Sequence, residues 1–293
     1  MEPTRSPLSA KLDALRQSLA ATGGVLVAFS GGCDSAFLLA MASEVLGDRA
    51  GAATGVSPSI PAAERKAAAE LAGRLGARHV FVETSEFELP GYLANGVDRC
   101  FHCKSALFDV LEPLARDMGL AAIAVGTNAD DLGDFRPGQE AARVRDVLTP
   151  LADAGFTKAD VREASKAMGL PTWDKPPAAC LASRLPYGTP INPSALARIQ
   201  AAEEVLTGLG FRQVRVRDHG NLGRIEVEAA EMERLASAGI RKKVAQALRD
   251  LGYTYVAADL DGFRSGSMNE VLDLVPGGPN PVPVPDDEGE EGP

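Results

Sequence analysis

The chain has 293 residues, of which 45% are hydrophobic, and a formal net charge of -10 at pH 7. This composition suffices for two modest domains with their own cores and excludes a disordered chain. There is no run of eighteen apolar residues and no secretory signal, so we expect a cytoplasmic protein outside the membrane. The acidic balance argues against nucleic acid as a partner, because nucleic-acid binding depends on Lys and Arg neutralising phosphates.

The first half of the chain alternates helical and extended patterns. Leucines at helical spacing predict an amphipathic helix at 8–21, and the apolar run at 25–29 predicts a strand buried on both faces. The alternation then continues, with strands expected at 50–56, 79–83 and 121–125 and helices at 35–46, 61–76, 103–118 and 157–168. This βαβα order predicts an α/β fold with a doubly wound parallel sheet.

The pattern changes after a proline-rich segment, Pro171 to Pro177, which we expect to end a first domain at 1–177. The next part predicts a smaller α+β domain at 178–275. Its expected elements are a helix at 194–209, a half-exposed antiparallel hairpin at 214–217 and 224–227, helices near 231–250 and a strand at 253–258. The tail at 276–293 is acidic and rich in proline and glycine, and we expect it to be disordered.

A glycine-rich loop, Ser30-Gly31-Gly32-Cys33-Asp34-Ser35, joins the first predicted strand to the next helix. Its glycines allow close approach of the backbone to an anion, and the helix N-terminus offers free N–H groups. It is neither a Walker loop nor a dinucleotide fingerprint. Two further segments also follow predicted strands, one with Ser57 and one running from Gly126 to the paired Asp130 and Asp131. All three would meet at the carboxyl edge of the sheet, although in isolation the paired carboxylates are more typical of a solvated turn.

The four cysteines are too few for a disulfide framework in a chain of this length. Cys100 and Cys103 form a C-x₂-C before a predicted helix, whose N-terminal dipole would lower the thiol pKa values. A zinc knuckle needs a second pair, so a metal site would have to recruit Cys180 through the fold. A lone Cys180 is typical of a small buried hydrophobe, whereas Arg184, four residues later, favours an electropositive thiol.

Arg215 and Arg217 alternate with valines, so both side chains should lie on one face of a strand. This spacing suits bidentate binding of a phosphate, and an ordinary solvated strand face is the alternative. Arg224 and Arg264 are secondary candidates.

The loop Ser30 to Ser35 resembles the SGGxDS signature of PP-loop ATP-pyrophosphatases. The resemblance implies that the loop binds the β- and γ-phosphates of ATP, that the segment with Ser57 borders adenine, and that Asp34 with Asp130 or Asp131 helps to place Mg²⁺. Hard carboxylate oxygens suit that ion.

Two further segments resemble one branch of this superfamily, the LarE family, and the resemblance extends over about residues 8–272. They contain Cys180-Leu181-Ala182-Ser183-Arg184 and Gly266-Ser267-Met268-Asn269-Glu270. The resemblance implies an ATP-dependent sulfurtransferase of nickel-pincer cofactor synthesis, which adenylates a carboxylate of pyridinium biscarboxylic acid mononucleotide and replaces AMP with sulfur. It further implies a homo-oligomer, a hexamer, and a substrate-phosphate site at Arg184, Arg215, Arg217 and Arg264.

The resemblance leaves two sulfur sources open. Either Cys180 gives up its own sulfur and becomes dehydroalanine, or Cys100, Cys103 and Cys180 bind a [4Fe-4S] cluster whose fourth iron carries a renewable sulfide. The presence of the C-x₂-C favours the cluster, with zinc as the third alternative. Rival functions are transfer RNA thiolation, an amidoligase of the same fold, and an iron-sulfur or zinc carrier without ATP chemistry.

Overall fold

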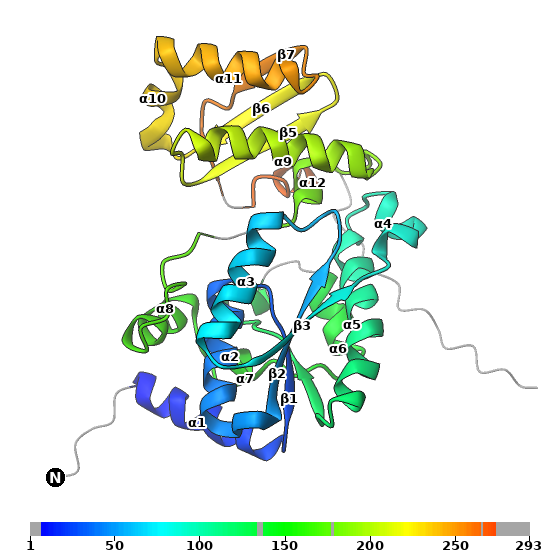
Figure 1. Cartoon of the computed structure of the whole chain (residues 1–293), viewed down its shortest axis with the longest axis vertical. Helices are drawn as coiled ribbons and strands as arrows, with labels where there is room; N and C mark the ends of the chain where they lie inside the picture. The colour runs from blue at the N-terminus through cyan, green and yellow to red at the C-terminus, as the bar shows by residue number, and fades with distance from the viewer. Residues whose placement is uncertain (1–6, 134–136, 177–178, 265, 274–293) are drawn as a thin grey trace, which may run out of the picture.

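A computed structural model of the chain describes residues 7–133, 137–176, 179–264 and 266–273 (Figure 1). The tail expected to be disordered lies outside the described residues, as does Pro177 at the expected domain boundary. Within the described part, no helix is long and apolar enough to cross a membrane.

The first unit is built on four parallel strands in the order β3-β2-β1-β4. They are β1 (Val25–Ala28), β2 (Ala50–Val56), β3 (Arg78–Glu83) and β4 (Ala122–Ala124). The sheet confirms the α/β fold expected from the sequence. The inner strand β1 is a continuous apolar run because both faces of the sheet are covered there, whereas the edge strand β3 is partly exposed.

Alternate residues of β1 pack into two separate hydrophobic cores, since successive side chains of a strand point to opposite faces. Val25 and Val27 pack into one core with α1 (Pro7–Ala21), α2 (Cys33–Leu46), α3 (Ala62–Arg74), α7 (Pro150–Asp153) and α8 (Lys158–Ala167). Leu26 packs on the other face with α5 (Arg99–Asp117) and α6 (Pro137–Arg143). The sheet is therefore wound on both sides, as predicted.

Element positions agree with the sequence analysis apart from two points. Helix α5 begins at Arg99, four residues before the expected start at 103, so the C-x₂-C lies inside the helix rather than before it. The short helices α4 (Pro90–Leu93), α6, α7 and α12 (Glu270–Asp273) were not predicted, because segments of four to seven residues show too little periodicity.

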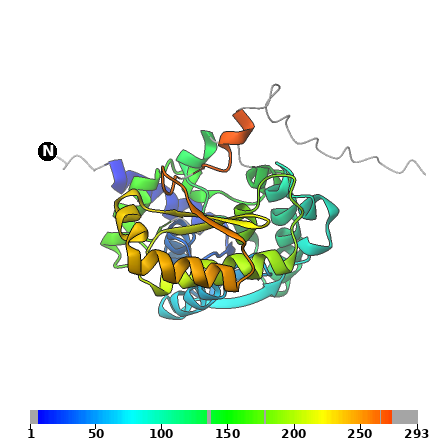
Figure 2. The same ribbon diagram turned by 90° about the horizontal axis from the view of Figure 1, so that it is seen from above.

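The second unit has a sheet in the order β5-β6-β7, with helices α9 (Pro193–Gly208), α10 (Met232–Ala236) and α11 (Ala238–Asp250). Strands β5 (Val214–His219) and β6 (Leu222–Val227) form the predicted antiparallel hairpin, and β7 (Tyr255–Ala258) runs parallel to β6. A last short helix, α12, spans Glu270–Asp273. The second unit lies above the carboxyl edge of the first sheet (Figures 1 and 2).

One apolar cluster joins the two units. Tyr92 and its neighbours around α4 pack against Leu181, Leu185, Ile191 and Leu196, which follow the proline-rich segment. Cys103 and Cys180 both lie against this cluster. Cys180 therefore packs against residues of the first unit, and the chain continues from there into the second unit.

Candidate active site

The glycine-rich loop connects β1 to α2 at the position expected from the sequence. Gly31 has a φ of 69°, which favours glycine, and a Cβ there would lie 3.1 Å from Ala68 of α3. Ser30 Oγ accepts a hydrogen bond from the Gly32 amide at 3.3 Å and lies 3.1 Å from Ser35 Oγ. Helix α2 begins within the loop, so the amides of its first turn border it and form a site suited to an anion.

The two other predicted segments reach the same place. Gly126 is pressed against the loop, since a Cβ on it would lie 2.8 Å from the Ser35 nitrogen. Ser57 is buried, and its Oγ lies 2.8 Å from that of Ser59. These segments border a cavity of about 660 Å³ at the strand ends, which we call the strand-end cavity; the predicted nucleotide-binding residues that line it are Ser30, Gly32, Asp34, Ser57, Asp130 and Asp131.

The three acidic residues all accept hydrogen bonds from neighbouring residues, although Asp130 is exposed. Asp34 accepts a hydrogen bond from Asn128 Nδ2 at 3.3 Å and pairs with the ammonium of Lys158. Asp131 Oδ2 accepts from the Asn128 amide at 3.1 Å, and Asp130 Oδ2 accepts from the Lys158 amide at 2.8 Å. One network therefore joins all three carboxylates.

Asn128, Lys158 and Lys175 are site residues that the sequence analysis missed. Lys175 Nζ donates to the Gly31 carbonyl at 3.1 Å and pairs with Glu64 at 2.7 Å. Lys158 is the first residue of α8, where a cation opposes the helix dipole. Because a cation is unfavourable at that position, the lysine itself indicates that an anion lies nearby. The neighbourhood of Lys175 gives no local signal, because Lys175 is 144 residues from the loop that it contacts.

Cys100, Cys103 and Cys180 all line the strand-end cavity, as does Cys33 of the glycine-rich loop. Cys100 is exposed, whereas Cys103 and Cys180 are partly covered. In the described part of the chain, no three His, Cys, Asp or Glu side chains are gathered closely enough to hold a metal ion. The fourth cysteine, Cys33, is buried in the first turn of α2, with its sulfur 4.0 Å from Ser165 Oγ.

The lowered thiol pKa expected for the C-x₂-C is wrong for Cys103. Burial raises the pKa of Cys103 to about 12, and the neighbouring Cys180 and Glu86 add to the effect. The helix dipole does not prevail, because Cys103 lies in the covered part of α5 next to the apolar cluster.

Arg215 and Arg217 share one face of β5, as predicted, but the expected exposure is wrong because both are buried. Their face turns toward the Cys180 segment, and Arg217 donates to the Ser183 carbonyl at 2.9 Å. Arg217 also forms a bidentate pair with the buried Glu226. Arg215 lies over the ring of Phe263, and burial followed by the nearby Arg184 lowers the pKa of Arg215 to about 10.

Arg184 supports the backbone next to Cys180. Its guanidinium donates to the Cys180 carbonyl at 3.0 Å and forms a bidentate pair with Glu203. Arg264 lies further out, where it pairs with Glu270 and Asp261. The secondary candidate Arg224 pairs with Glu226 and Asp259.

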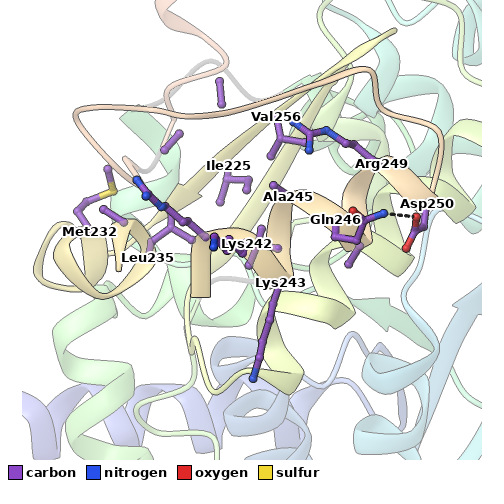
Figure 3. Close-up of a pocket in the computed structure, with 16 residues that line it drawn as sticks. Ile225, Met232, Leu235, Lys242, Lys243, Ala245, Gln246, Arg249, Asp250 and Val256 are labelled. Carbon is purple, nitrogen blue, oxygen red and sulfur yellow. Dashed lines mark hydrogen bonds between the residues drawn. The ribbon is translucent and has the colours of Figure 1, made fainter. Parts of the chain in front are cut away.

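A second cavity of about 1050 Å³ lies in the second unit, between the β6–β7 edge and α11 (Figure 3). Ile225, Leu235 and Val256 contribute apolar surface to it, and Lys242 and Arg249 lie beside them. Its lining comes from β6, β7, α10 and α11, so it is separate from the residues predicted for the reaction.

Comparison with known proteins agrees with this geometry. A family profile described as asparagine synthase matches residues 10–101, which include the glycine-rich loop. An uncharacterised protein of Synechocystis is 42% identical over 265 residues, which cover 90% of this chain and 99% of that protein. An uncharacterised protein of Methanocaldococcus jannaschii is 28% identical over 173 residues, 59% of this chain and 67% of its own length.

A third relative has a named activity. It is pyridinium-3,5-bisthiocarboxylic acid mononucleotide synthase of Lactiplantibacillus plantarum, 37% identical over 250 residues, which cover 85% of this chain and 90% of the synthase. A match of this length has to include the Cys180 segment, which lines the strand-end cavity. The chain belongs to the LarE family, that of pyridinium-3,5-bisthiocarboxylic acid mononucleotide synthase, within the PP-loop ATP-pyrophosphatases.

Proposed function

We propose that this protein uses ATP to adenylate a carboxylate of pyridinium biscarboxylic acid mononucleotide and then replaces AMP with sulfur. The product is a thiocarboxylate for nickel-pincer cofactor synthesis. One observation carries the proposal: a single cavity is lined both by the PP-loop and by Cys100, Cys103 and Cys180. The activity named for the relative from Lactiplantibacillus plantarum supports the same substrate.

At the PP-loop side, the loop amides and hydroxyls would bind the β- and γ-phosphates of ATP. Asp34, Asp130 and Asp131 offer oxygen ligands suited to Mg²⁺, which would offset phosphate charge when bound. Lys158 already neutralises Asp34. On binding of Mg²⁺ to that carboxylate, the Lys158 ammonium would be released toward the phosphates.

The substrate carboxylate would then attack the α-phosphorus of ATP. The bond between the α-phosphorus and the bridging oxygen breaks, and pyrophosphate leaves with the electron pair. Lys158 and Lys175 lie at this side of the cavity and would stabilise the growing negative charge. The result is an acyl-adenylate whose carbonyl carbon is open to a sulfur nucleophile.

For the sulfur source, we propose that Cys100, Cys103 and Cys180 together bind a [4Fe-4S] cluster. Three thiolates are a suitable donor set for iron, and all three line one cavity. When bound, such a cluster would supply a replaceable sulfide. The three side chains would have to lie closer together than they do in the structure, and Cys103 would have to lose its proton.

The alternative source is Cys180 itself. Its thiolate would attack the adenylate carbonyl and expel AMP, leaving a thioester at Cys180. A base would then remove the Cα proton, the Cβ–S bond would break, and the sulfur would leave as the thiocarboxylate. Dehydroalanine would remain at position 180, so each chain would deliver one sulfur.

Nucleotide analysis tests the proposed reaction directly. Incubation of the protein with ATP, Mg²⁺ and the mononucleotide should produce AMP and pyrophosphate, with a gain of sulfur in the substrate mass. Asp34→Ala should lose AMP formation while its circular dichroism spectrum stays that of the parent, because Asp34 lies at the cavity wall. Formation of ADP in place of AMP would contradict the assignment.

A further inference from the structure

Two buried side chains in the wall of the strand-end cavity have polar atoms without a hydrogen-bond partner. Glu86 belongs to the short 3-10 helix Glu86–Glu88 and is 2% exposed. Its Oε2 atom finds no partner among the residues that the structure describes. Tyr92 of α4 is 1% exposed, and its hydroxyl makes no hydrogen bond of acceptable geometry within the same residues. Neither side chain has a role in the reaction proposed above.

Glu86 is fixed in place through its other oxygen. Glu86 Oε1 accepts a hydrogen bond from Ser59 Oγ at 3.4 Å, and Ser59 Oγ lies 2.8 Å from Ser57 Oγ. Burial raises the pKa of Tyr92, and the nearby Ser59 opposes that effect. The Ser59 carbonyl also accepts from the Leu181 amide at 2.8 Å. Glu86 and Tyr92 therefore lie where the loop after β2 meets the Cys180 segment.

A buried carboxylate oxygen without a partner is unfavourable, because it has left water and gained no hydrogen bond. Native proteins contain few such atoms, and each one requires an explanation. Here the unpaired atoms of Glu86 and Tyr92 belong to side chains that line the reaction cavity. A bound ligand with hydrogen-bonding groups of its own would satisfy both.

The chemistry of the wall restricts which ligand group can lie there. The negative charge of Glu86 repels phosphates and carboxylates, so its partner has to be a hydrogen-bond donor. In ATP and a pyridinium mononucleotide, the neutral donors are the ribose hydroxyls and the amino group of adenine. Vicinal ribose hydroxyls offer donors and acceptors side by side, which suits a carboxylate next to a phenol. Carboxylates bind ribose hydroxyls in the same way in dinucleotide-binding folds.

We propose that Glu86 and Tyr92 form a binding subsite for the vicinal hydroxyls of a ribose. The inference rests on the proposed function, because ATP and the pyridinium mononucleotide are the two riboses that the cavity would receive. The subsite lies on the Cys180 side of Ser57, so it would hold a ribose between the PP-loop and the thiols.

Calorimetric titration of the full chain tests the subsite without any need for sulfur transfer. The probes are α,β-methylene-ATP with Mg²⁺, the pyridinium mononucleotide, and the 2′-deoxy form of each. The proteins are the parent, Glu86→Gln, Tyr92→Phe and, as a matched control, Glu88→Gln, whose side chain lies on the same short helix but is exposed. Both site variants keep the size of the original side chain, and equal melting temperatures would show that they fold.

If ATP supplies the ribose, the parent should bind the 2′-deoxy ATP analogue about tenfold more weakly than the ribose form. Glu86→Gln should bind the ribose form about tenfold more weakly than the parent and no longer distinguish the two. The same pattern with the mononucleotide pair would assign the subsite to that ribose. Glu88→Gln should match the parent throughout.

The proposal is wrong if Glu86→Gln distinguishes the ribose form from the 2′-deoxy form of both ligands as well as the parent does. A further probe is the α,β-methylene analogue of purine riboside triphosphate, which lacks the adenine amino group. The proposal is also wrong if Glu86→Gln instead loses discrimination between this probe and α,β-methylene-ATP, since that would place the adenine amino group at Glu86. Formation of AMP by the parent gives a separate test of the reaction. If the parent protein makes no AMP but Glu86→Gln still abolishes discrimination between the ribose and 2′-deoxy probes, the proposed function is refuted and the subsite is not.

Discussion

Gly126 illustrates how a single residue brings two segments of the site together. It is 91 residues from Ser35 in sequence, yet its lack of a side chain allows the end of β4 to contact the backbone of the PP-loop. The neighbours that a Cβ would meet are backbone atoms of Asp34 and Ser35, which cannot turn aside as the end of a flexible side chain would. The position of the loop therefore depends on the absence of a side chain at Gly126.

Gly126→Ala should shift the PP-loop and weaken the binding of ATP, since the new Cβ would lie 2.8 Å from the Ser35 nitrogen. Forced contacts of this kind cost about 1 to 3 kcal/mol of stability. Calorimetric titration with ATP and a thermal melt measure the two effects. Gly73→Ala on α3 is the matched control, because nothing lies within 4 Å of its added Cβ. Equal ATP affinity in both variants would contradict the close approach.

The arginines of β5 differ in what they already bind. Arg217 is committed to Glu226 and to the Ser183 carbonyl, whereas Arg215 lies over Phe263 beside the cationic Arg184. Replacing Arg217 would therefore also disturb the Cys180 segment, so a change at Arg215 is the more selective test of the proposed substrate-phosphate site.

Arg215→Ala should weaken binding of the mononucleotide by about 1.5 to 3 kcal/mol, the contribution of a charge-assisted hydrogen bond, and leave ATP binding unchanged. Separate calorimetric titrations with the two ligands measure this. Arg212→Ala removes an exposed arginine from the same region and should leave both affinities unchanged. An unchanged mononucleotide affinity in Arg215→Ala would place the substrate phosphate elsewhere.

Cys100, Cys103 and Cys180 distinguish the two sulfur sources. Cys100→Ala should abolish iron binding and limit the protein to one turnover or none, because a cluster would lose one of three ligands. Iron and acid-labile sulfide content after anaerobic purification, together with the intact mass after reaction, measure this. Cys33→Ala is the control for iron content, since Cys33 lies in α2 at the PP-loop side.

The opposite result would be equally clear. If Cys100→Ala and the parent each transfer one sulfur per chain, and both become lighter by the mass of hydrogen sulfide at Cys180, the protein consumes its own cysteine and the cluster proposal fails.

At the scale of elements, α8 shows how local signals fix a helix that carries a site residue. Thr157 and Asp160 form a capping box, in which each side chain accepts a hydrogen bond from the backbone amide of the other. Lys11 of α1 also pairs with Asp160 at 2.6 Å. The cap starts the helix at Lys158, and it thereby points the Lys158 ammonium at Asp34.

The hydrogen bond from Lys11, and then those from Thr157, lower the pKa of Asp160 from 3.8 to about 2. The stabilisation by the charged carboxylate is therefore complete above about pH 4 and is lost as the pH falls toward 2. Asp160→Asn should reduce the free energy of unfolding at pH 7 by about 1 kcal/mol. Its melting temperature should also fall less steeply than that of the parent between pH 4 and pH 2.

Thermal melts at several pH values measure both effects. Glu163→Gln, an exposed carboxylate on the same helix, should follow the parent across the pH range. Parallel acid profiles for the parent and Asp160→Asn would show that the pKa of Asp160 is not lowered by folding.

At the scale of the whole molecule, the two units are less independent than a boundary at 177 and 178 implies. The apolar cluster around Tyr92 takes Leu181, Leu185 and Leu196 from the far side of that boundary. Arg184 and Arg217 then tie the Cys180 segment to α9 and β6 through Glu203 and Glu226. The division into domains and the expected hexamer both stay predictions.

The full chain should therefore unfold in a single calorimetric transition, because the cluster around Tyr92 belongs to both units. Leu185→Ala should lower the midpoint of the whole transition, with a loss of about 2 to 5 kcal/mol for a buried leucine. Two resolved transitions, only one of which moves in Leu185→Ala, would show that the units unfold separately.

Local sequence patterns are sufficient to predict the α/β fold, the position of the PP-loop and the C-x₂-C, and the antiparallel hairpin of the second unit. These features depend on local periodicity, turn residues and motif spacing, which neighbouring residues contain in full. The start of α5 and the short helices were missed because their local signals are weak.

The contacts between side chains that are distant in sequence could be seen only in the tertiary structure. Lys158 reaches Asp34 across 124 residues and Lys175 reaches Gly31 across 144, and the local pattern does not identify the partner of either lysine. The raised pKa of Cys103 and the burial of Arg215 and Glu86 likewise depend on what packs over them. Burial and partnership arise from segments distant in sequence, so the composition of the cavity emerged only when the chain was folded.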